Sequence, residues 1–335
     1  MITRSLQMIF TQAGVIEPSS AFLLQTLNST QVSLSEDEGE TWQLLQTDSP
    51  YPLQLAATND AFVLATHYSA EHGLRIMRST NGVNWTELPH NIPNSTISFA
   101  YVAYNGSVFG LMLASSNSSL QKFYYSNDGI TWLAQVTPSR SYASARLYAA
   151  DSKFAICRAN TGEIIQFGDI GSSFIERAAT NLGFGTTYYG VSCANYFNNY
   201  LVVFGSQGRK ISTSPNANGV FTSRVSQSNN DGWKCAANSD TFLIAAGATA
   251  SNATLCYWTT DGTTWVNGSS YLAGANGVGS TAGASCAVNV NGTIVLIGAN
   301  GNVCRTTNGY DMERIGVTQT PWASLNTLIY KKAVA

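Results

Sequence analysis

Two histidines and a glutamate lie close together in the chain and have the chemistry of metal ligands. They are His67, Glu71 and His72, and the only other histidine is His90. Imidazole nitrogens and a carboxylate suit Zn²⁺, but a protein zinc site needs three or four ligands held in place. The stretch is predicted to be a surface loop without a further ligand, so we expect no metal site there.

The most acidic stretch of the chain is a short turn. It contains Glu36, Asp37, Glu38 and Glu40. Its charge would suit Ca²⁺, but it lacks the regularly spaced oxygen ligands of a calcium-binding loop. We therefore expect a solvated hairpin tip, and the sequence predicts neither a metal nor any other cofactor.

No set of residues has the spacing of a catalytic site. Three histidines, two of them in one loop, give no basis for a Ser-His-Asp arrangement. No glycine-rich loop precedes a helix that could hold a phosphate. No two carboxylates can be placed on either side of a glycosidic bond. We therefore expect a protein that is not an enzyme.

A short motif of polar residues, glycine and tryptophan recurs along the chain. Its four clear copies contain Ser35, Asp37, Gly39 and Trp42; Ser79, Asn81, Gly82 and Trp85; Ser126, Asp128, Gly129 and Trp132; and Thr259, Asp261, Gly262 and Trp265. Three weaker copies end at Phe174, Phe221 and Met312. The large residue that ends each copy returns every 42 to 47 residues, which is typical of a repeat architecture.

The motif has the chemistry of a tight hairpin turn. Asp or Asn followed by Gly supplies the positive φ angles that such a turn needs. The hydroxyl and the carboxylate can accept the backbone N–H groups of the turn, and the tryptophan can point into the core. Segments of alternating polarity joined by a short turn, such as residues 99–113, precede the copies. Each repeat is therefore predicted to form four antiparallel strands.

Seven such units predict an all-β fold, a seven-bladed β-propeller with four-stranded antiparallel blades. We expect a terminal strand to close the ring. Residues 320–330 resemble residues 49–58, the opening strand of the second repeat, and would supply the innermost strand of the first blade. Alternatively, residues 1–18 supply that strand. The predicted organisation is an N-terminal arm or closing strand at 1–18 and a propeller at 19–335.

The motif resembles the Asp box, or bacterial neuraminidase repeat, of sialidases and of many non-enzymatic propellers. Residues 35–42 match its full form, and the other three clear copies match a form shortened by one residue. The resemblance implies a structural role for these residues, on turns opposite the ligand mouth. A sialidase would also need three arginines, a Tyr–Glu pair, an acid/base Asp and an Arg-Ile-Pro-type motif. That last motif is missing, because the most similar string is Arg75-Ile76-Met77.

Aromatic residues lie on or next to the connections that are predicted to line the ligand mouth. They are Tyr51, Tyr142, Tyr188, Tyr189, Trp233, Tyr271 and Trp322. Rings beside neutral Asn, Gln and Ser side chains suit a sugar-binding surface that needs no charge. The alternative is that these rings cap the cores of the blades.

The overall composition restricts the possible partners. Only 11% of the residues are charged and the net charge is −2, so we expect no nucleic-acid partner. The sequence has no apolar stretch of membrane-spanning length and no recognisable signal peptide, so membrane insertion is not expected. Six cysteines without metal-binding spacing lie in apolar, strand-like runs and are predicted to be buried thiols.

The composition, poor in charge and rich in Asn, Ser, Thr, Gly and aromatic residues, resembles that of bacteriophage tail, fibre and decoration proteins. The short form of the motif is frequent in such proteins. The resemblance implies a non-enzymatic virion component, made in the host cytoplasm and attached to other virion proteins through its terminal segments. It would belong to a homo- or hetero-oligomeric assembly and present a face to a host surface glycan or receptor. The alternatives are a free-standing lectin-like propeller, a sialidase-like glycosidase and an intracellular assembly factor.

Overall fold

The computed structural model comprises two compact units, Met1–Ala143 with Ser324–Ala335, and Ser144–Ala323. The residues that it describes are 22–26, 31–46, 54–58, 63–69, 73–92, 99–114, 122–135, 145–150, 153–158, 164–168, 170, 175–178, 182, 191–205, 210–215, 220–226, 232–248, 254–279, 283–318 and 327–331. These residues form strands throughout, apart from turns and one short helix.

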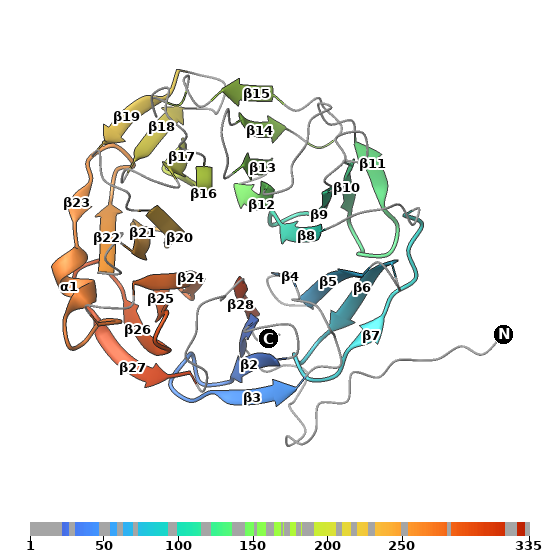
Figure 1. Cartoon of the computed structure of the whole chain (residues 1–335), viewed down its shortest axis with the longest axis horizontal. Coiled ribbons are helices and arrows are strands. Elements are labelled where there is room, and N and C mark those ends of the chain that lie inside the picture. The colour runs from blue at the N-terminus through green and yellow to red at the C-terminus, as the bar shows by residue number, and fades with distance from the viewer. Residues whose placement is uncertain are drawn as a thin grey trace. The chain divides into compact units, whose positions relative to one another are not determined.

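The first unit contains three antiparallel sheets of four strands each (Figure 1). The first sheet has the order β28 (Thr327–Lys331), β1 (Phe22–Thr26), β2 (Gln31–Ser35) and β3 (Gln43–Gln46). The second has the order β4 (Gln54–Ala57), β5 (Val63–Ser69), β6 (Gly73–Ser79) and β7 (Thr86–Glu87). The third has the order β8 (Phe99–Tyr104), β9 (Phe109–Ala114), β10 (Lys122–Ser126) and β11 (Leu133–Gln135).

The second unit contains four sheets of the same kind. They consist of β12 (Ala145–Ala150), β13 (Lys153–Arg158), β14 (Ile164–Gly168) and β15 (Ile175–Ala178); β16 (Val191–Phe197), β17 (Tyr200–Gly205), β18 (Ile211–Pro215) and β19 (Thr222–Val225); β20 (Gly232–Asn238), β21 (Leu243–Ala248), β22 (Thr254–Thr259) and β23 (Val266–Asn267); and β24 (Ala284–Val290), β25 (Thr293–Gly298), β26 (Asn302–Thr306) and β27 (Glu313–Val317). The helix α1 (Ser269–Ala273) lies between β23 and β24 in the sequence. The predicted all-β fold and the four-stranded antiparallel repeat are thus confirmed.

The C-terminal strand completes the first sheet. β28 pairs with β1 in antiparallel register, from Phe22 opposite Lys331 to Thr26 opposite Thr327. Of the two predicted closing strands, the one from the C-terminal segment is therefore correct. Residues 1–18 lie outside the described residues, and their role as an arm stays a prediction.

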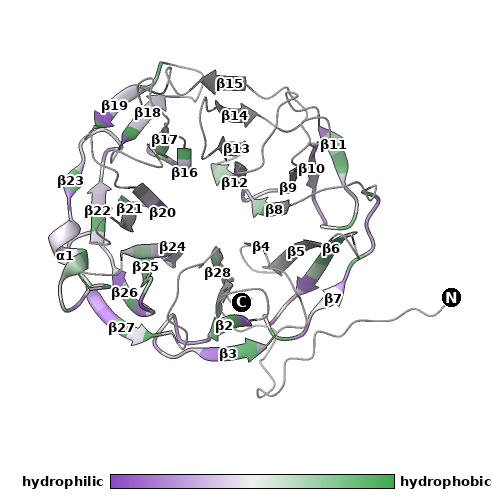
Figure 2. Ribbon diagram, viewed as in Figure 1, coloured by the Kyte–Doolittle hydropathy of each residue, from purple (hydrophilic) through white to green (hydrophobic). Residues whose placement is uncertain are grey.

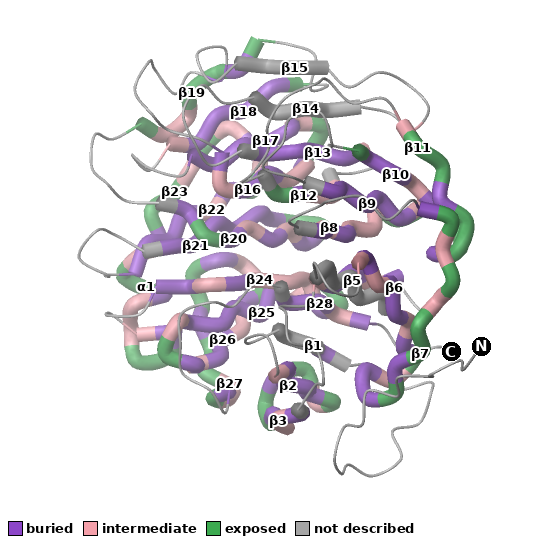
Figure 3. The backbone as a smooth tube through the Cα atoms, turned by 45° about the vertical axis from the view of Figure 1, so that its right-hand side comes forward, coloured by how far each residue is buried: buried purple, intermediate pink, exposed green. Residues whose placement is uncertain are grey.

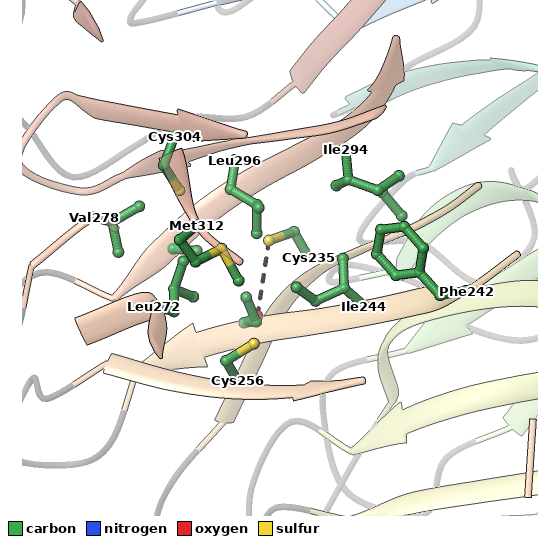
Figure 4. Close-up of a cluster of buried hydrophobic side chains, with 13 residues drawn as sticks. Cys235, Phe242, Ile244, Cys256, Leu272, Val278, Ile294, Leu296, Cys304 and Met312 are labelled. Atoms are coloured by element: carbon green, nitrogen blue, oxygen red, sulfur yellow. Dashed lines mark hydrogen bonds between the residues drawn. The ribbon is translucent and has the colours of Figure 1, made fainter. Parts of the chain in front are cut away.

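Within each unit, successive sheets pack on one another and bury apolar side chains between them. In the second unit the first strands β12, β16, β20 and β24 contact one another in turn. Phe242, Ile244, Ile294 and Leu296 fill the space between the last two sheets (Figure 4). Each such side chain stabilises the fold by about 1.5–3 kcal/mol relative to its exposed state.

In several sheets the last strand is the most exposed. β7, β11, β23 and β27 consist mainly of exposed residues, whereas β6, β10, β22 and β25 of the same sheets are mostly buried (Figure 3). Figure 2 shows hydrophilic stretches on β19 and β27. Exposed residues therefore gather on these last strands, which form the solvated outer edges of the sheets, and buried residues gather on the strands inside them.

The six cysteines are free thiols and all are buried, as predicted. Cys193, Cys235 and Cys286 occupy the same place in β16, β20 and β24, each directly after a β-bulge. The Cys235 thiol donates to the carbonyl oxygen of Ala246 at 3.8 Å (Figure 4). Burial raises the pKa of the Cys193 and Cys304 thiols to about 12. Because the thiolate is the nucleophilic form, these thiols are not suited to covalent catalysis at neutral pH.

Candidate functional site

The polar residues of the recurring motif bind one another and the backbone of their own turn. In the third clear copy the Ser126 hydroxyl donates to Asp128 Oδ1 at 2.9 Å and accepts the Gly129 N–H at 2.9 Å. Asp128 Oδ1 also accepts the N–H groups of Ile130 and Thr131, each at 2.8 Å. The side chains thereby satisfy three backbone donors of a turn that has no ladder partner.

The bond from the glycine N–H to the hydroxyl recurs in the other copies of the motif that the structure describes. Copies that begin at Ser35, Ser79, Thr259 and Thr306 all bond the serine or threonine hydroxyl to the glycine N–H, at 2.8–2.9 Å. The glycines have φ between 73° and 102°, a range that disfavours other residues. We call these five segments, residues 35–42, 79–85, 126–132, 259–265 and 306–312, the box turns.

The tryptophans that end the first three box turns close them from the core side. Trp42, Trp85 and Trp132 donate their indole N–H to the carbonyl oxygen of the box glycine, at 2.9–3.1 Å. Trp265 differs, because its buried Nε1 has no hydrogen-bond partner among the described residues. Its ring instead packs edge-on against Phe204, with centroids 5.8 Å apart.

The box carboxylates are held in their ionised form. The N–H groups of Thr131 and Ile130 lower the pKa of Asp128. Partial burial opposes ionisation of Asp261, but the N–H groups of Thr264 and Thr263 lower its pKa well below the usual range. A carboxyl group that stays ionised near neutral pH cannot donate a proton as a general acid. These residues are therefore chemically suited to holding the turns.

The structure describes two of the seven aromatic residues that were predicted to face a ligand. Tyr51, Tyr142, Tyr188, Tyr189 and Trp322 lie outside the described residues. Trp233 is a core residue and not a ligand-face residue, because only 1% of it is exposed. Its indole N–H donates to the carbonyl oxygen of Lys210 at 3.0 Å, and its ring lies edge-on to Phe204 and Tyr257. For Trp233 the alternative, that the ring caps a blade core, is correct.

Tyr271 is 51% exposed and is the candidate that reaches solvent. It lies on α1, which contacts β22 at the outer side of its sheet (Figure 1). Leu272 and Val278 anchor this connection, since both are fully buried in the core between the last two sheets (Figure 4). The Val278 N–H donates to the Leu272 carbonyl oxygen at 2.9 Å, so the connection is tied to itself as well.

Tyr310, which was not predicted as a site residue, lies beside Tyr271. It follows the glycine of the last box turn and is 43% exposed. Its ring centroid is 6.5 Å from that of Tyr271 and 5.7 Å from that of Trp258 on β22. We call Trp258, Tyr271 and Tyr310 the aromatic ledge. A signal in the sequence was available, namely a large aromatic residue directly after the glycine of a box turn.

Two glycines allow the backbone to approach Trp258 closely. A Cβ added at Gly309 would lie 2.8 Å from Trp258 Cγ, and one added at Gly268 would lie 3.1 Å from Trp258 Cδ1. The indole Nε1 is buried and has no partner among the described residues. Close packing on both sides therefore holds the Trp258 ring and, through it, the position of Tyr310.

Most of the histidine-containing stretch lies outside the described residues, so the expectation of no metal site there stays a prediction. The side chain of His67 and the residues Glu71 and His72 lie outside the described residues, and His90 Nε2 lies 3.1 Å from the Leu74 carbonyl oxygen. Within the described ranges, no three His, Cys, Asp or Glu side chains are grouped as metal ligands. No helix in the same ranges is long and apolar enough to cross a membrane.

Comparisons with solved structures identify the fold. No family model and no curated protein matches the sequence. The structure is similar to YCF48 bound to a D1 peptide, with a TM-score of 0.55 and 15% identity over 96% of this chain and 95% of that chain. The chain has a β-propeller fold. It is also similar to YCF48 from Cyanidioschyzon merolae, with a TM-score of 0.55 and 15% identity over 89% of this chain and 94% of that one.

The structure is also similar to a designed protein. The computationally designed Ika8 protein matches with a TM-score of 0.56 and 11% identity, over 98% of this chain and 95% of that one. At these identities the similarities establish the propeller fold and leave the function to be argued from the residues.

The box carboxylate is expected to stabilise the fold in a pH-dependent way. Asp128→Ala removes the acceptor of two backbone N–H groups and should lower the free energy of unfolding by about 1–2 kcal/mol at pH 7. Asp128→Asn keeps an acceptor oxygen, as Asn81 does in the second box turn, and should lower the free energy of unfolding by less than Asp128→Ala does. Guanidinium chloride unfolding followed by circular dichroism measures both changes.

The sign of the pH dependence follows from the lowered pKa of Asp128. The stabilisation by the ionised carboxylate is fully present above the unfolded-state pKa of about 3.9 and is lost as the pH falls through the folded-state pKa. The difference in the free energy of unfolding between the wild type and Asp128→Asn should therefore become smaller as the pH is lowered from 5 to 2, values about one to two units either side of that pKa. A difference that is the same at both pH values would contradict this assignment.

Two glycine substitutions test how tightly the ledge is packed. Gly309 and Gly292 have φ of 87° and 89°, and a Cβ at Gly292 would have nothing within 4 Å. Gly309→Ala should therefore destabilise the protein by about 1–3 kcal/mol more than Gly292→Ala, because only the former adds overpacking against Trp258. Unfolding midpoints measure the difference. Equal midpoints would show that the Trp258 ring is free to move away.

Proposed function

We propose that the protein is a non-enzymatic structural component of a bacteriophage virion, held in the tail or capsid through its terminal segments. In this role a charge-poor propeller would present its outer surface to a host glycan or receptor. The observation that carries the non-enzymatic part is that the hydroxyl and carboxylate groups repeated along the chain are used up within the box turns. The lowered pKa of Asp128 and Asp261 supports the same reading.

The pairing of the first described strand with the last supports attachment at one place. Phe22 and Lys331, the described residues nearest to the two ends, lie opposite each other in the pairing of β1 with β28. A partner that binds the terminal segments would thus engage one end of a single sheet. The similarity to YCF48 bound to a D1 peptide supports the idea that a propeller of this kind can hold a protein segment.

A lectin-like propeller is the second candidate, and the aromatic ledge favours it. Tyr271 and Tyr310 are neighbouring exposed rings, and the net charge of the chain is only −2. Recognition by ring stacking and neutral hydrogen bonds would suit such a surface. The two candidates are compatible, since a virion component that binds host glycans would have both properties.

Deletion of residues 1–18 tests the attachment role. We expect the truncated protein to fold, because β28 and not this segment pairs with β1, but to be incorporated into virions at least about tenfold less, the loss that a deficit of about 1.4 kcal/mol in binding produces. Quantitative mass spectrometry of purified particles measures incorporation. A matched control replaces the same residues with a Gly/Ser linker of equal length, and should fail in the same way.

Normal incorporation of the truncated protein would contradict the proposed attachment. Circular dichroism melting of the purified truncated chain separates this outcome from misfolding. A chain that melts like the wild type and is absent from particles supports the proposal.

A further inference from the structure

We propose that the aromatic ledge is a carbohydrate-binding site for neutral glycans, with Tyr310 as the central stacking residue. The inference rests on the proposed function, because it names the class of host ligand that the attached propeller would bind. It is argued from the exposure, the rigidity and the polar groups of the ledge.

The first argument is exposure. Among the described residues, Tyr271 and Tyr310 are the exposed aromatic side chains, and they lie on α1 and in the turn between β26 and β27 of the second unit. Their ring centroids lie 6.5 Å apart at an interplanar angle of 60°. Two rings inclined to each other offer adjoining apolar faces to the C–H groups of a pyranose. Single exposed apolar residues are common on protein surfaces, whereas two adjoining exposed rings provide a surface on which a ligand can stack.

The second argument is that the ledge is built before a ligand arrives. Tyr271 is next to Leu272, which is buried in the core, and Tyr310 follows Gly309, whose backbone packs on Trp258 (Figure 4 shows the anchoring core). The Tyr310 N–H donates to Asn308 Oδ1 at 3.1 Å, so the box turn fixes the backbone of this residue. A ligand therefore does not have to order the backbone of either residue, which lowers the entropic cost of binding.

The third argument concerns the polar groups that follow Tyr310. Asp311 is exposed, and its Oδ2 accepts the Asn308 Nδ2–H at 2.8 Å. Its N–H is bound to Asn308 Oδ1 at 2.8 Å, which holds the carboxylate directly after the tyrosine in the turn. A fixed carboxylate is a strong acceptor for sugar hydroxyl groups.

The same carboxylate decides between neutral and acidic sugars. Because Asp311 directly follows Tyr310, a sialic acid carboxylate bound at the ledge would lie near a like charge. The arginines on the two strands that flank this turn, Arg305 on β26 and Arg314 on β27, already have other contacts. Arg305 Nε lies 2.7 Å from Glu313 Oε2, and Arg314 Nη2 donates to Asn302 Oδ1 at 2.6 Å. The ligand class that fits the ledge is therefore a neutral hexose or N-acetylhexosamine glycan.

A printed array of glycans that differ only in terminal sialylation, followed by calorimetry with the best neutral oligosaccharide, tests the inference. The wild type should bind neutral members, and Tyr310→Ala should weaken binding at least tenfold. Tyr271→Phe should bind like the wild type, because it keeps the ring. Ile130→Ala is the matched control, since Ile130 follows the glycine of the third box turn and is 38% exposed.

Asp311→Asn provides a second readout that does not depend on loss of binding. It should reduce the difference in binding affinity between the neutral and the sialylated glycan of each pair, because the negative charge of Asp311 is removed. The inference is overturned if the wild type binds no neutral glycan, prefers the sialylated members, or binds as well after Tyr310→Ala. None of these outcomes changes the incorporation of the protein into virions, so failure of this site is distinguishable from failure of the proposed attachment.

Discussion

The hydrogen bonds between the serine or threonine hydroxyl, the Asp or Asn oxygen and the backbone N–H groups of the box turns are the interaction on which much of this structure depends. Each described box turn joins the third strand of a sheet to the fourth. At this point the chain reverses without ladder partners, and the side chains of Ser126 and Asp128 supply the missing acceptors. Without Ser126 the buried N–H group of Gly129 would remain unpaired, at a cost of about 1–3 kcal/mol.

The same bonds explain why the box residues are poorly suited to catalysis and where a candidate binding surface lies. Carboxylates with lowered pKa that are saturated by N–H donors are poor catalysts but good turn residues. The residue after the box glycine leaves its side chain outside the network, and that side chain is exposed in three turns, as Glu40, Ile130 and Tyr310. In the last box turn a tyrosine at this position meets Tyr271 from the preceding connection. A structural repeat thereby places a candidate ligand surface at the outer edge of two sheets.

The sequence predicted what is set by local chemistry and period. The box turns and the four-stranded units follow from turn residues and alternation, and the buried thiols follow from their apolar surroundings. The closing strand was left as two alternatives, and the pairing of β28 with β1 decides for the C-terminal one. The short helix with Tyr271 and its approach to Tyr310 could not be predicted, because they depend on how Leu272 and Val278 enter the core. Trp233 was placed at the ligand face because of its position near a connection, but its indole N–H found a backbone acceptor in the core.

The central claim is that side-chain acceptors in the box turns hold this propeller together, and native-state hydrogen exchange at single-residue resolution tests it most directly. The amides of Gly82, Gly129 and Gly309 lie in turns, yet each donates to a serine or threonine hydroxyl. The account predicts that they exchange about 100-fold or more slowly than unstructured amides, as strand amides do in locally stable regions. Exchange at the unstructured rate would contradict it.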